Sequence, residues 1–322
     1  MNPRGAVGGG PPAGPRRPVT APLSPRAASV AAARQLRRPS ARRAEGRFLA
    51  EGFQAVEAAL ATGRLTELFV GESAAARHGG LVAEVTAAGL PVRRVTDQAA
   101  AALSETVTPQ GLVGVATLSG VRLTDLGVPG GQGVARGVVR AGAAADGAGR
   151  HGRPTLVAVC VAANDPGNAG TVIRTADAAG ADVVVFAGEG VDPFGGKCVR
   201  ASAGSLFHLP VIVEPDLGAA LDWLRAVGCQ VVATSGHGAR DLYDAADSGE
   251  LDGPTGWLFG NEAHGLSTDV LAAADAVLRV PVYGQAESLN LAVATALCLY
   301  ASARARRMAR SGTHGTGGGG RR

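Results

Sequence analysis

Residues 161–186, VAANDPGNAGTVIRTADAAGADVVVF, contain the pattern that decides the fold. A run of β-branched and apolar residues at 156–162 ends at a polar turn, residues 164–167. Apolar positions at helical spacing then predict a helix with Asn168 as its N-cap and Gly180 at its end, followed by an apolar strand at 183–186. This β-turn-α-β unit of roughly 30 residues is the building block of a parallel α/β sheet.

The glycines of this segment do not have the spacing of a dinucleotide-binding turn. Gly167, Gly170 and Gly180 do not match the Gly-x-Gly-x-x-Gly fingerprint, and Arg174 lies in the second turn of the predicted helix. A nucleotide-dependent oxidoreductase is therefore disfavoured.

Three motifs in a fixed order instead resemble the SpoU (TrmH-type) branch of the SPOUT superfamily. The first is carried by the spacing of Asn168, Gly170, Arg174, Ala176, Ala178 and Gly180. The second and third are GWLFGNEAHGLS at 256–267 and LRVPVYGQAESLNLAVATALCLY at 278–300. Members of this branch transfer a methyl group from S-adenosylmethionine to a ribose 2′-hydroxyl of RNA, so the resemblance implies this activity for the chain.

The resemblance also implies the fold class and its domains. We expect an α/β protein: a parallel-sheet SPOUT domain with a C-terminal deep trefoil knot, preceded by a small α/β substrate-binding domain similar to a ribosomal-protein fold. A dimerising or merely stabilising role for that first domain stays open. The expected divisions are a disordered basic tail (1–25), an RNA substrate-binding domain (26–119), a flexible linker (120–153), a SpoU-type methyltransferase domain (154–308) and a disordered tail (309–322).

Five polar residues are the expected catalytic set. In the family the first-motif arginine, here Arg174, lies at the reacting hydroxyl. A guanidinium with a pKa above about 12 is a poor base. We therefore expect Arg174 to position the ribose or phosphate and to stabilise the forming alkoxide. The full set is Arg174, Asn168, Glu262, Ser288 and Asn290.

The other four residues have more than one expected role. We expect Asn168 to orient Arg174 or the ribose. Glu262 is expected either to form a charge-assisted pair with Arg174 or to act on the hydroxyl directly. Ser288 and Asn290 open the last predicted helix, where serine is a common N-cap, so they are expected to serve the helix as well as the site.

The cofactor is expected at the carboxyl ends of three strands, because open α/β sheets bind ligands at that edge. The predicted strands end at residues 234, 260 and 280. The resemblance implies that this edge binds S-adenosylmethionine, with Gly260 letting the backbone approach the adenosine closely. The expected cofactor residues are Thr234, Gly260, Asn261, Val280 and Leu289. No metal ion is expected, since the sulfonium activates the methyl group.

The net charge of +4 is unevenly distributed. Residues 1–47 hold ten Arg and one Glu, and residues 304–322 hold six Arg and no acid. Arginine binds phosphate groups, so Arg42, Arg43 and Arg47 are expected to contact RNA. For residues 1–25 a codon bias toward Arg, Ala and Gly is the favoured explanation.

The remaining features concern the cell compartment and the partners. Four widely spaced cysteines indicate reduced core residues rather than a metal site or disulfides, and neither a signal peptide nor a membrane span is evident, so we expect a cytoplasmic protein. The apolar stripe of the last helix indicates either core or a subunit interface, and the resemblance implies a homodimer. The expected substrate is 23S ribosomal RNA. A transfer RNA enzyme and a non-catalytic RNA-binding or ribosome-assembly dimer are the alternatives.

Overall fold

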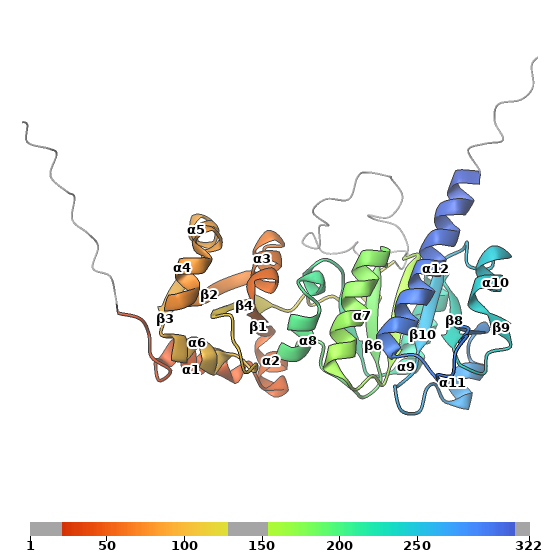
Figure 1. Ribbon diagram of the computed structural model, residues 1–322, viewed down its shortest axis with the longest axis horizontal. Helices are drawn as coiled ribbons and strands as arrows, with labels where there is room; N and C mark the ends of the chain where they lie inside the picture. Colours follow the sequence, from red (N-terminus) through yellow and green to blue (C-terminus); the bar gives the residue numbers. More distant parts are fainter. Residues whose placement is uncertain (1–20, 128–153, 313–322) are drawn as a thin grey trace, which may run out of the picture.

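The computed structural model describes residues 21–127 and 154–312, which form two sheets with their helices (Figure 1). The first sheet has four strands in the order β1-β4-β2-β3, of which only the β2-β3 pair is parallel. Its strands are β1 (Arg47–Glu51), β2 (Leu65–Gly71), β3 (Val92–Val95) and β4 (Leu112–Thr117). The helices around it are α1 (Ala28–Gln35), α2 (Pro39–Glu45), α3 (Phe53–Ala61), α4 (Glu72–Arg77), α5 (Gly79–Ala87) and α6 (Asp97–Leu103).

The second sheet has seven strands in the order β7-β6-β5-β10-β8-β11-β9, and every pair is parallel. Its strands are β5 (Leu156–Val161), β6 (Val183–Ala187), β7 (Val211–Glu214), β8 (Gln230–Thr234), β9 (Arg240–Asp241), β10 (Thr255–Phe259) and β11 (Ala276–Arg279). The helices are α7 (Pro166–Ala179), α8 (Gly196–Ala201), α9 (Leu217–Ala226), α10 (Leu242–Asp247), α11 (Thr268–Ala272) and α12 (Leu291–Gly312). The predicted parallel α/β architecture is confirmed.

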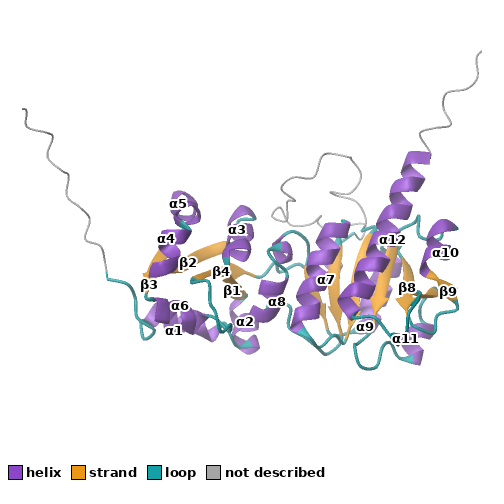
Figure 2. Cartoon of the chain, in the orientation of Figure 1, coloured by secondary structure: helices purple, strands orange, loops and turns teal. Residues whose placement is uncertain are grey.

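Helices cover both faces of the second sheet (Figure 2). Alternate residues of β5 point into different clusters: Ala158 and Cys160 pack with α7 and α12, whereas Val157 and Val159 pack with α9. A strand buried on both faces is a nearly continuous apolar run, which explains why β5 and β6 were recognisable from the sequence. No helix within the described ranges is long and apolar enough to cross a membrane.

The ends of two elements differ from the prediction. Helix α7 begins at Pro166 with Asp165, not Asn168, as its N-cap, and the Asp165 carboxylate accepts a hydrogen bond from the backbone N–H of Asn168. Asp and Asn are both good N-caps, and proline at the first helical position favours the earlier start. Helix α12 continues to Gly312, so the predicted disordered tail 309–322 is wrong for its first four residues.

The predicted linker and basic tail also contain ordered residues. A short 3₁₀ helix (Leu123–Asp125) lies in the expected linker 120–153, and Leu126 is buried with its carbonyl accepting a hydrogen bond from Trp223 Nε1 at 3.1 Å. In the expected tail 1–25, the backbone of Leu23 pairs with Val95 at the end of β3. Residues 1–20, 128–153 and 313–322 lie outside the described residues.

Candidate active site

Three segments distant in the sequence meet at the carboxyl edge of the second sheet and share one hydrogen-bonded chain of side chains. Asn168, in the first turn of α7, donates from Nδ2 to Glu262 Oε1 at 3.0 Å. Its Oδ1 accepts from Asn290 Nδ2 at 2.9 Å. The Asn168 amide therefore holds Glu262 on one side and Asn290 on the other, and its orientation is fixed because the two ends of the amide have opposite hydrogen-bonding character.

Asn290 also caps α12. Its Oδ1 accepts a hydrogen bond from the backbone N–H of Ala292 at 2.9 Å, at the start of the helix. Both Ser288 and Asn290 were expected to serve this helix; the expectation is confirmed for Asn290 and wrong for Ser288, which lies in an exposed loop three residues before the helix. Asn290 thus serves both as the cap of α12 and as a member of the candidate site. Its two hydrogen bonds fix the position of α12 relative to α7.

Arg174 does not join this chain. It lies on the exposed side of α7, and its guanidinium makes no hydrogen bond or ion pair with any residue that the structure describes. The predicted pairing of Arg174 with Glu262 is therefore wrong within one chain, since Glu262 binds Asn168 instead. An exposed cation on the same helix as Asn168, unpaired among the described residues, is available to a phosphate or to a developing negative charge.

Asp165 and Lys197 lie next to the candidate site, and neither was among the residues predicted for it. The Lys197 ammonium on α8 donates to Asp165 Oδ2 at 2.8 Å, while Asp165 Oδ1 accepts from the Asn168 backbone at 2.7 Å. The hydrogen bond from Lys197, followed by that from the Asn168 backbone, lowers the pKa of Asp165. The signal that predicts the cap is Asp165 directly before Pro166, an N-cap and first-position pair.

The five predicted cofactor residues follow strands that are neighbours in the sheet. Strands β10, β8 and β11 lie side by side; Thr234 is the last residue of β8, and the other four residues lie in the loops after β10 and β11. All five residues are half-buried, neither in the core nor fully exposed: Thr234, Gly260, Asn261, Val280 and Leu289. The Thr234 hydroxyl donates to the Leu258 carbonyl at 3.1 Å, so it joins β8 to β10.

Gly260 is required by the geometry of its own loop. A Cβ at this position would lie 2.3 Å from the carbonyl carbon of Gly265 and 2.5 Å from the nitrogen of Leu266. The close approach in the structure is thus made by the loop's own backbone, and the approach of an adenosine to Gly260 stays a prediction. The loop of residues 260–266 closes on itself, and only glycine fits at its base.

Asn261 has a structural role in the same loop. Its Nδ2 donates to the Ala162 carbonyl at 2.7 Å, and its Oδ1 accepts from the Ala263 backbone at 2.8 Å. Ala162 has a φ of 49°, a left-handed conformation that costs a non-glycine residue about 1–2 kcal/mol. Such local strain persists where the surroundings hold the backbone in place. Asn261 therefore fixes the loop that carries Glu262 to the end of β5.

The predicted RNA-binding arginines divide into three environments. Arg42 is buried, with its side chain 6% exposed and paired with Asp192 at 2.7 Å, so its assignment as an RNA contact is wrong. Arg47 is half-buried and pairs with Glu45. Arg43 is exposed and, among the described residues, unpaired. A charge pattern alone does not show which arginine is buried, because the partner Asp192 lies 150 residues away.

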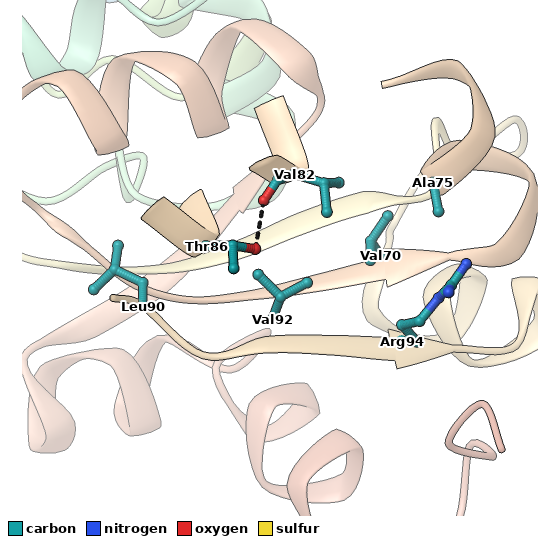
Figure 3. A pocket seen from close by; sticks show the side chains of 7 residues that line it. All are labelled: Val70, Ala75, Val82, Thr86, Leu90, Val92 and Arg94. Carbon is teal, nitrogen blue, oxygen red and sulfur yellow. Dashed lines mark hydrogen bonds between the residues drawn. The ribbon is translucent and has the colours of Figure 1, made fainter. Parts of the chain in front are cut away.

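The cysteines and a cavity in the first domain lie outside this chemistry. Burial, and secondarily the charge of Glu262, raises the pKa of Cys160 to about 12, so its thiol stays protonated behind the site. A cavity of about 440 Å³ lies between α4, α5 and the strands β2 and β3, with Arg94 at one end (Figure 3). It includes none of the predicted site residues.

The fold and the site together define a parallel-sheet α/β domain joined to a smaller α/β domain. Residues 155–300 match the model of the SpoU rRNA Methylase family, and residues 28–114 match that of the MRM3-like substrate binding domain. The tRNA (guanosine(18)-2′-O)-methyltransferase of Thermus thermophilus is 35% identical over 161 residues, 49% of this chain and 78% of that protein. The chain belongs to the SpoU rRNA methylase family, as the motifs predicted.

Two other relatives illustrate the similarity. The 23S rRNA (guanosine(2553)-2′-O)-methyltransferase RlmP of Bacillus subtilis is 43% identical over 139 residues, 43% of this chain and 54% of that protein, so the match spans about half its length. The crystal structure of the SpoU methyltransferase AviRb from Streptomyces viridochromogenes in complex with AdoMet superposes with a TM-score of 0.71 at 27% identity. It covers 88% of this chain and 99% of that one.

Proposed function

We propose that the protein transfers a methyl group from S-adenosylmethionine to a ribose 2′-hydroxyl of 23S ribosomal RNA. The observation that carries this proposal is the hydrogen-bonded chain Glu262-Asn168-Asn290, which joins three separate segments at the sheet edge. The relatives named as 23S rRNA 2′-O-methyltransferases and the AdoMet-bound neighbour support the substrate and the cofactor.

The residues at the sheet edge fit this cofactor. Thr234, Gly260, Asn261, Val280 and Leu289 would hold it, since all five are half-buried at adjoining strand ends and loops that combine apolar surface with backbone polar groups. When bound, S-adenosylmethionine supplies an electrophilic methyl group.

Glu262 is the proposed acceptor of the hydroxyl proton. Its Oε1 is held by Asn168, while Oε2 has no partner within the described ranges and is free to accept from a ribose hydroxyl. A carboxylate within hydrogen-bonding reach of a hydroxyl is a suitable general base. Oε2 would take the hydroxyl proton, and the ribose oxygen would gain the methyl group as the bond from that methyl to the sulfur of the cofactor breaks, which leaves a neutral thioether. Arg174 stabilises the negative charge that develops on that oxygen.

The first domain is proposed to bind the RNA. Arg34 lies in the last turn of α1, Arg38 is the N-cap residue of α2 and Arg43 lies in α2; all three are exposed and, among the described residues, unpaired. In Figure 1 helices α1 and α2 and the start of α12 lie along the same lower side of the molecule. Arginines on that side can bind the phosphates of an RNA that reaches the catalytic loops.

A homodimer and a deep trefoil knot complete the proposal. On α12, Val293 and Tyr300 are 48% and 52% exposed, which leaves apolar surface for a second copy. Sedimentation equilibrium should give twice the chain mass, and Val293→Asp should give the monomer.

The support for the knot is that α12, which follows β11 in the sequence, returns to pack on α7 and on β5. Pulling both ends of one molecule should leave a tightened knot that shortens the extended length.

Transfer RNA is the second candidate substrate, because the Thermus thermophilus relative named above is a tRNA enzyme. We would incubate the protein and labelled S-adenosylmethionine with unmodified 23S rRNA, ribosomal subunits and tRNA in parallel. Label in 23S rRNA or in large subunits supports the proposed substrate, and label in tRNA alone replaces it. A protein that binds both cofactor and RNA without labelling any pool would support the non-catalytic alternative.

A further inference from the structure

Residues 190–201, which comprise the loop after β6 and helix α8, contact both domains; we call them the bridge segment. Asp192 of this segment accepts hydrogen bonds from Arg42 Nη2 at 2.7 Å and Nε at 3.0 Å. The neighbouring Val191 N–H donates to the carbonyl of Ala163 at 2.8 Å. Ala163 lies two residues before Asp165, the N-cap of α7. The adjacent residues Asp192 and Val191 therefore connect the first domain to the turn that leads into α7.

Arg42 is held on every side. Besides Asp192, its Nη1 donates to the carbonyls of Leu36 and Arg37, at 2.9 and 2.8 Å. A buried guanidinium with four hydrogen bonds cannot shift without breaking several of them, because each group would lose its partner away from water. Arg42 thus fixes the bridge segment to the end of α1.

A second buried pair lies at α8. Arg200 Nη1 binds Glu51 Oε2 at 2.5 Å, and Glu51, at the end of β1, is only 5% exposed. The other oxygen of Glu51 accepts from the hydroxyl of Ser104. The two ion pairs attach the bridge segment to the first domain at separate points, which restricts rotation as well as translation.

The other side of α8 packs directly on α7, the helix that carries Asn168. A Cβ on Gly170 of α7 would lie 2.5 Å from the Cys198 carbonyl and 2.5 Å from the Ala201 Cβ, so the two helix backbones are in close contact. Lys197 adds its bond to Asp165, the N-cap of α7. That pair is largely exposed and contributes little stability by itself. The close backbone contact is the rigid part of the connection.

We infer that the bridge segment sets the position of Asn168 and Glu262 relative to RNA held by the first domain, with Arg42 as its positioning residue. The inference rests on the proposed function, because it concerns the same reaction. A misplacement of about 1 Å can cost roughly 100-fold in rate. A site divided between two domains therefore needs a fixed connection of this kind.

The test compares Arg42→Ala and Asp192→Asn with the wild type. Asp192→Asn keeps the shape and the oxygen that accepts from the Phe194 backbone, so it guards against a variant that does not fold. The matched control is Arg93→Ala, which removes an arginine–glutamate pair between β3 and β2 in the same domain. For each we would measure cofactor affinity, kcat and KM for RNA, and amide hydrogen exchange in residues 163–171.

We expect the amide hydrogens of residues 163–171 to exchange several-fold faster in Arg42→Ala and in Asp192→Asn than in the wild type. Both variants should also lose about 10- to 100-fold in kcat, with cofactor affinity unchanged. The control should keep wild-type values for all of these. Unchanged exchange at residues 163–171 in both variants would overturn the inference. Absence of methyl transfer in the wild type would overturn the proposed function instead, and the exchange data would still decide whether Arg42 positions α7.

Discussion

The side-chain amide of Asn168 donates a hydrogen bond to the carboxylate of Glu262 at 3.0 Å, although the two residues are 94 positions apart in the sequence. One comes from the helix after β5 and the other from the loop after β10, and these strands are neighbours in the sheet. The parallel pairing of β5 with β10 thus brings the acid and its partner together.

Asn168→Ala should lower methyl transfer by about 100- to 1000-fold, as expected when a preorganised hydrogen bond at a reacting group is removed. Glu262 would lose the donor that fixes its Oε1, and Asn290 would lose its acceptor. The rate is measured under single-turnover conditions. Asn164→Ala is the control, since this nearby asparagine is exposed and forms no side-chain hydrogen bond with the described residues. Equal rates for the two variants would contradict the role given to Asn168.

Arg174→Ala should abolish detectable transfer while changing the free energy of unfolding by no more than about 0.5 kcal/mol. The reason is that the side chain is exposed and unpaired within the described part of the chain, so the fold does not depend on it. Urea unfolding and transfer assays on one preparation separate the two effects. The comparison variant is Arg225→Ala on α9, at the opposite face of the sheet. Large destabilisation by Arg174→Ala would show a structural role instead.

Gly260→Ala should destabilise the protein by about 1–3 kcal/mol and weaken cofactor binding. The added methyl group meets the backbone of Gly265 and Leu266, which cannot move without opening the loop that carries Asn261 and Glu262. Gly236→Ala, in the loop after β8, has open space around its Cβ and should be close to neutral. Thermal unfolding and calorimetric titration with S-adenosylmethionine measure both effects. A Gly260→Ala protein with wild-type values would mean that the loop is not closed in solution.

The cap at the start of α7 should be sensitive to acid. The folded-state pKa of Asp165 lies below its ordinary value of 3.8, first because of Lys197 and then because of the Asn168 backbone. A depressed carboxyl pKa means that its stabilisation is present above about pH 4 and is lost as the pH falls through the folded-state value. Lys197→Ala should raise this pKa, measured by NMR titration of the Asp165 carboxyl carbon. An unchanged titration would exclude Lys197 as the main cause.

All four cysteines should be unreactive in the folded protein. Burial raises the pKa of Cys160 to about 12 and, together with the nearby Asp182 charge, that of Cys229 to about 11, and it also raises those of Cys198 and Cys298. The thiolate is the reactive form, so at pH 8 a disulfide reagent should label no thiol in the native state and four in denaturant. Rapid labelling of one native thiol would contradict this burial.

The sequence predicted the core of the second domain well and the polar contacts less well. Strands β5 and β6 are continuous apolar runs, and their predicted positions differ from the structure by one residue at an end. Helix α8 was not predicted because Gly195 and Gly196 interrupt the segment, although its packing on Gly170 holds it in place. A close contact between helices depends on the tertiary fold, which a local pattern does not contain.

The site residues were predicted as a set, but their pairings were not. Asn168, Glu262 and Asn290 were expected together because the three motifs carry them. That Glu262 binds Asn168 rather than Arg174 depends on side-chain directions around α7, where Asn168 and Arg174 point to different sides. The prediction that Arg42 contacts RNA was wrong for the same kind of reason, since the burial of Arg42 depends on Asp192 in another domain.

The most direct test of the central claim is the chemical identity of the methylated nucleotide. Unmodified 23S rRNA would be incubated with the protein and S-adenosylmethionine, digested to nucleosides and analysed by mass spectrometry, with Asn168→Ala in parallel. We predict one 2′-O-methylated nucleoside with the wild type and none above background with the variant. A methyl group on a base, or equal ribose methylation by the variant, would contradict the proposed site and its chemistry.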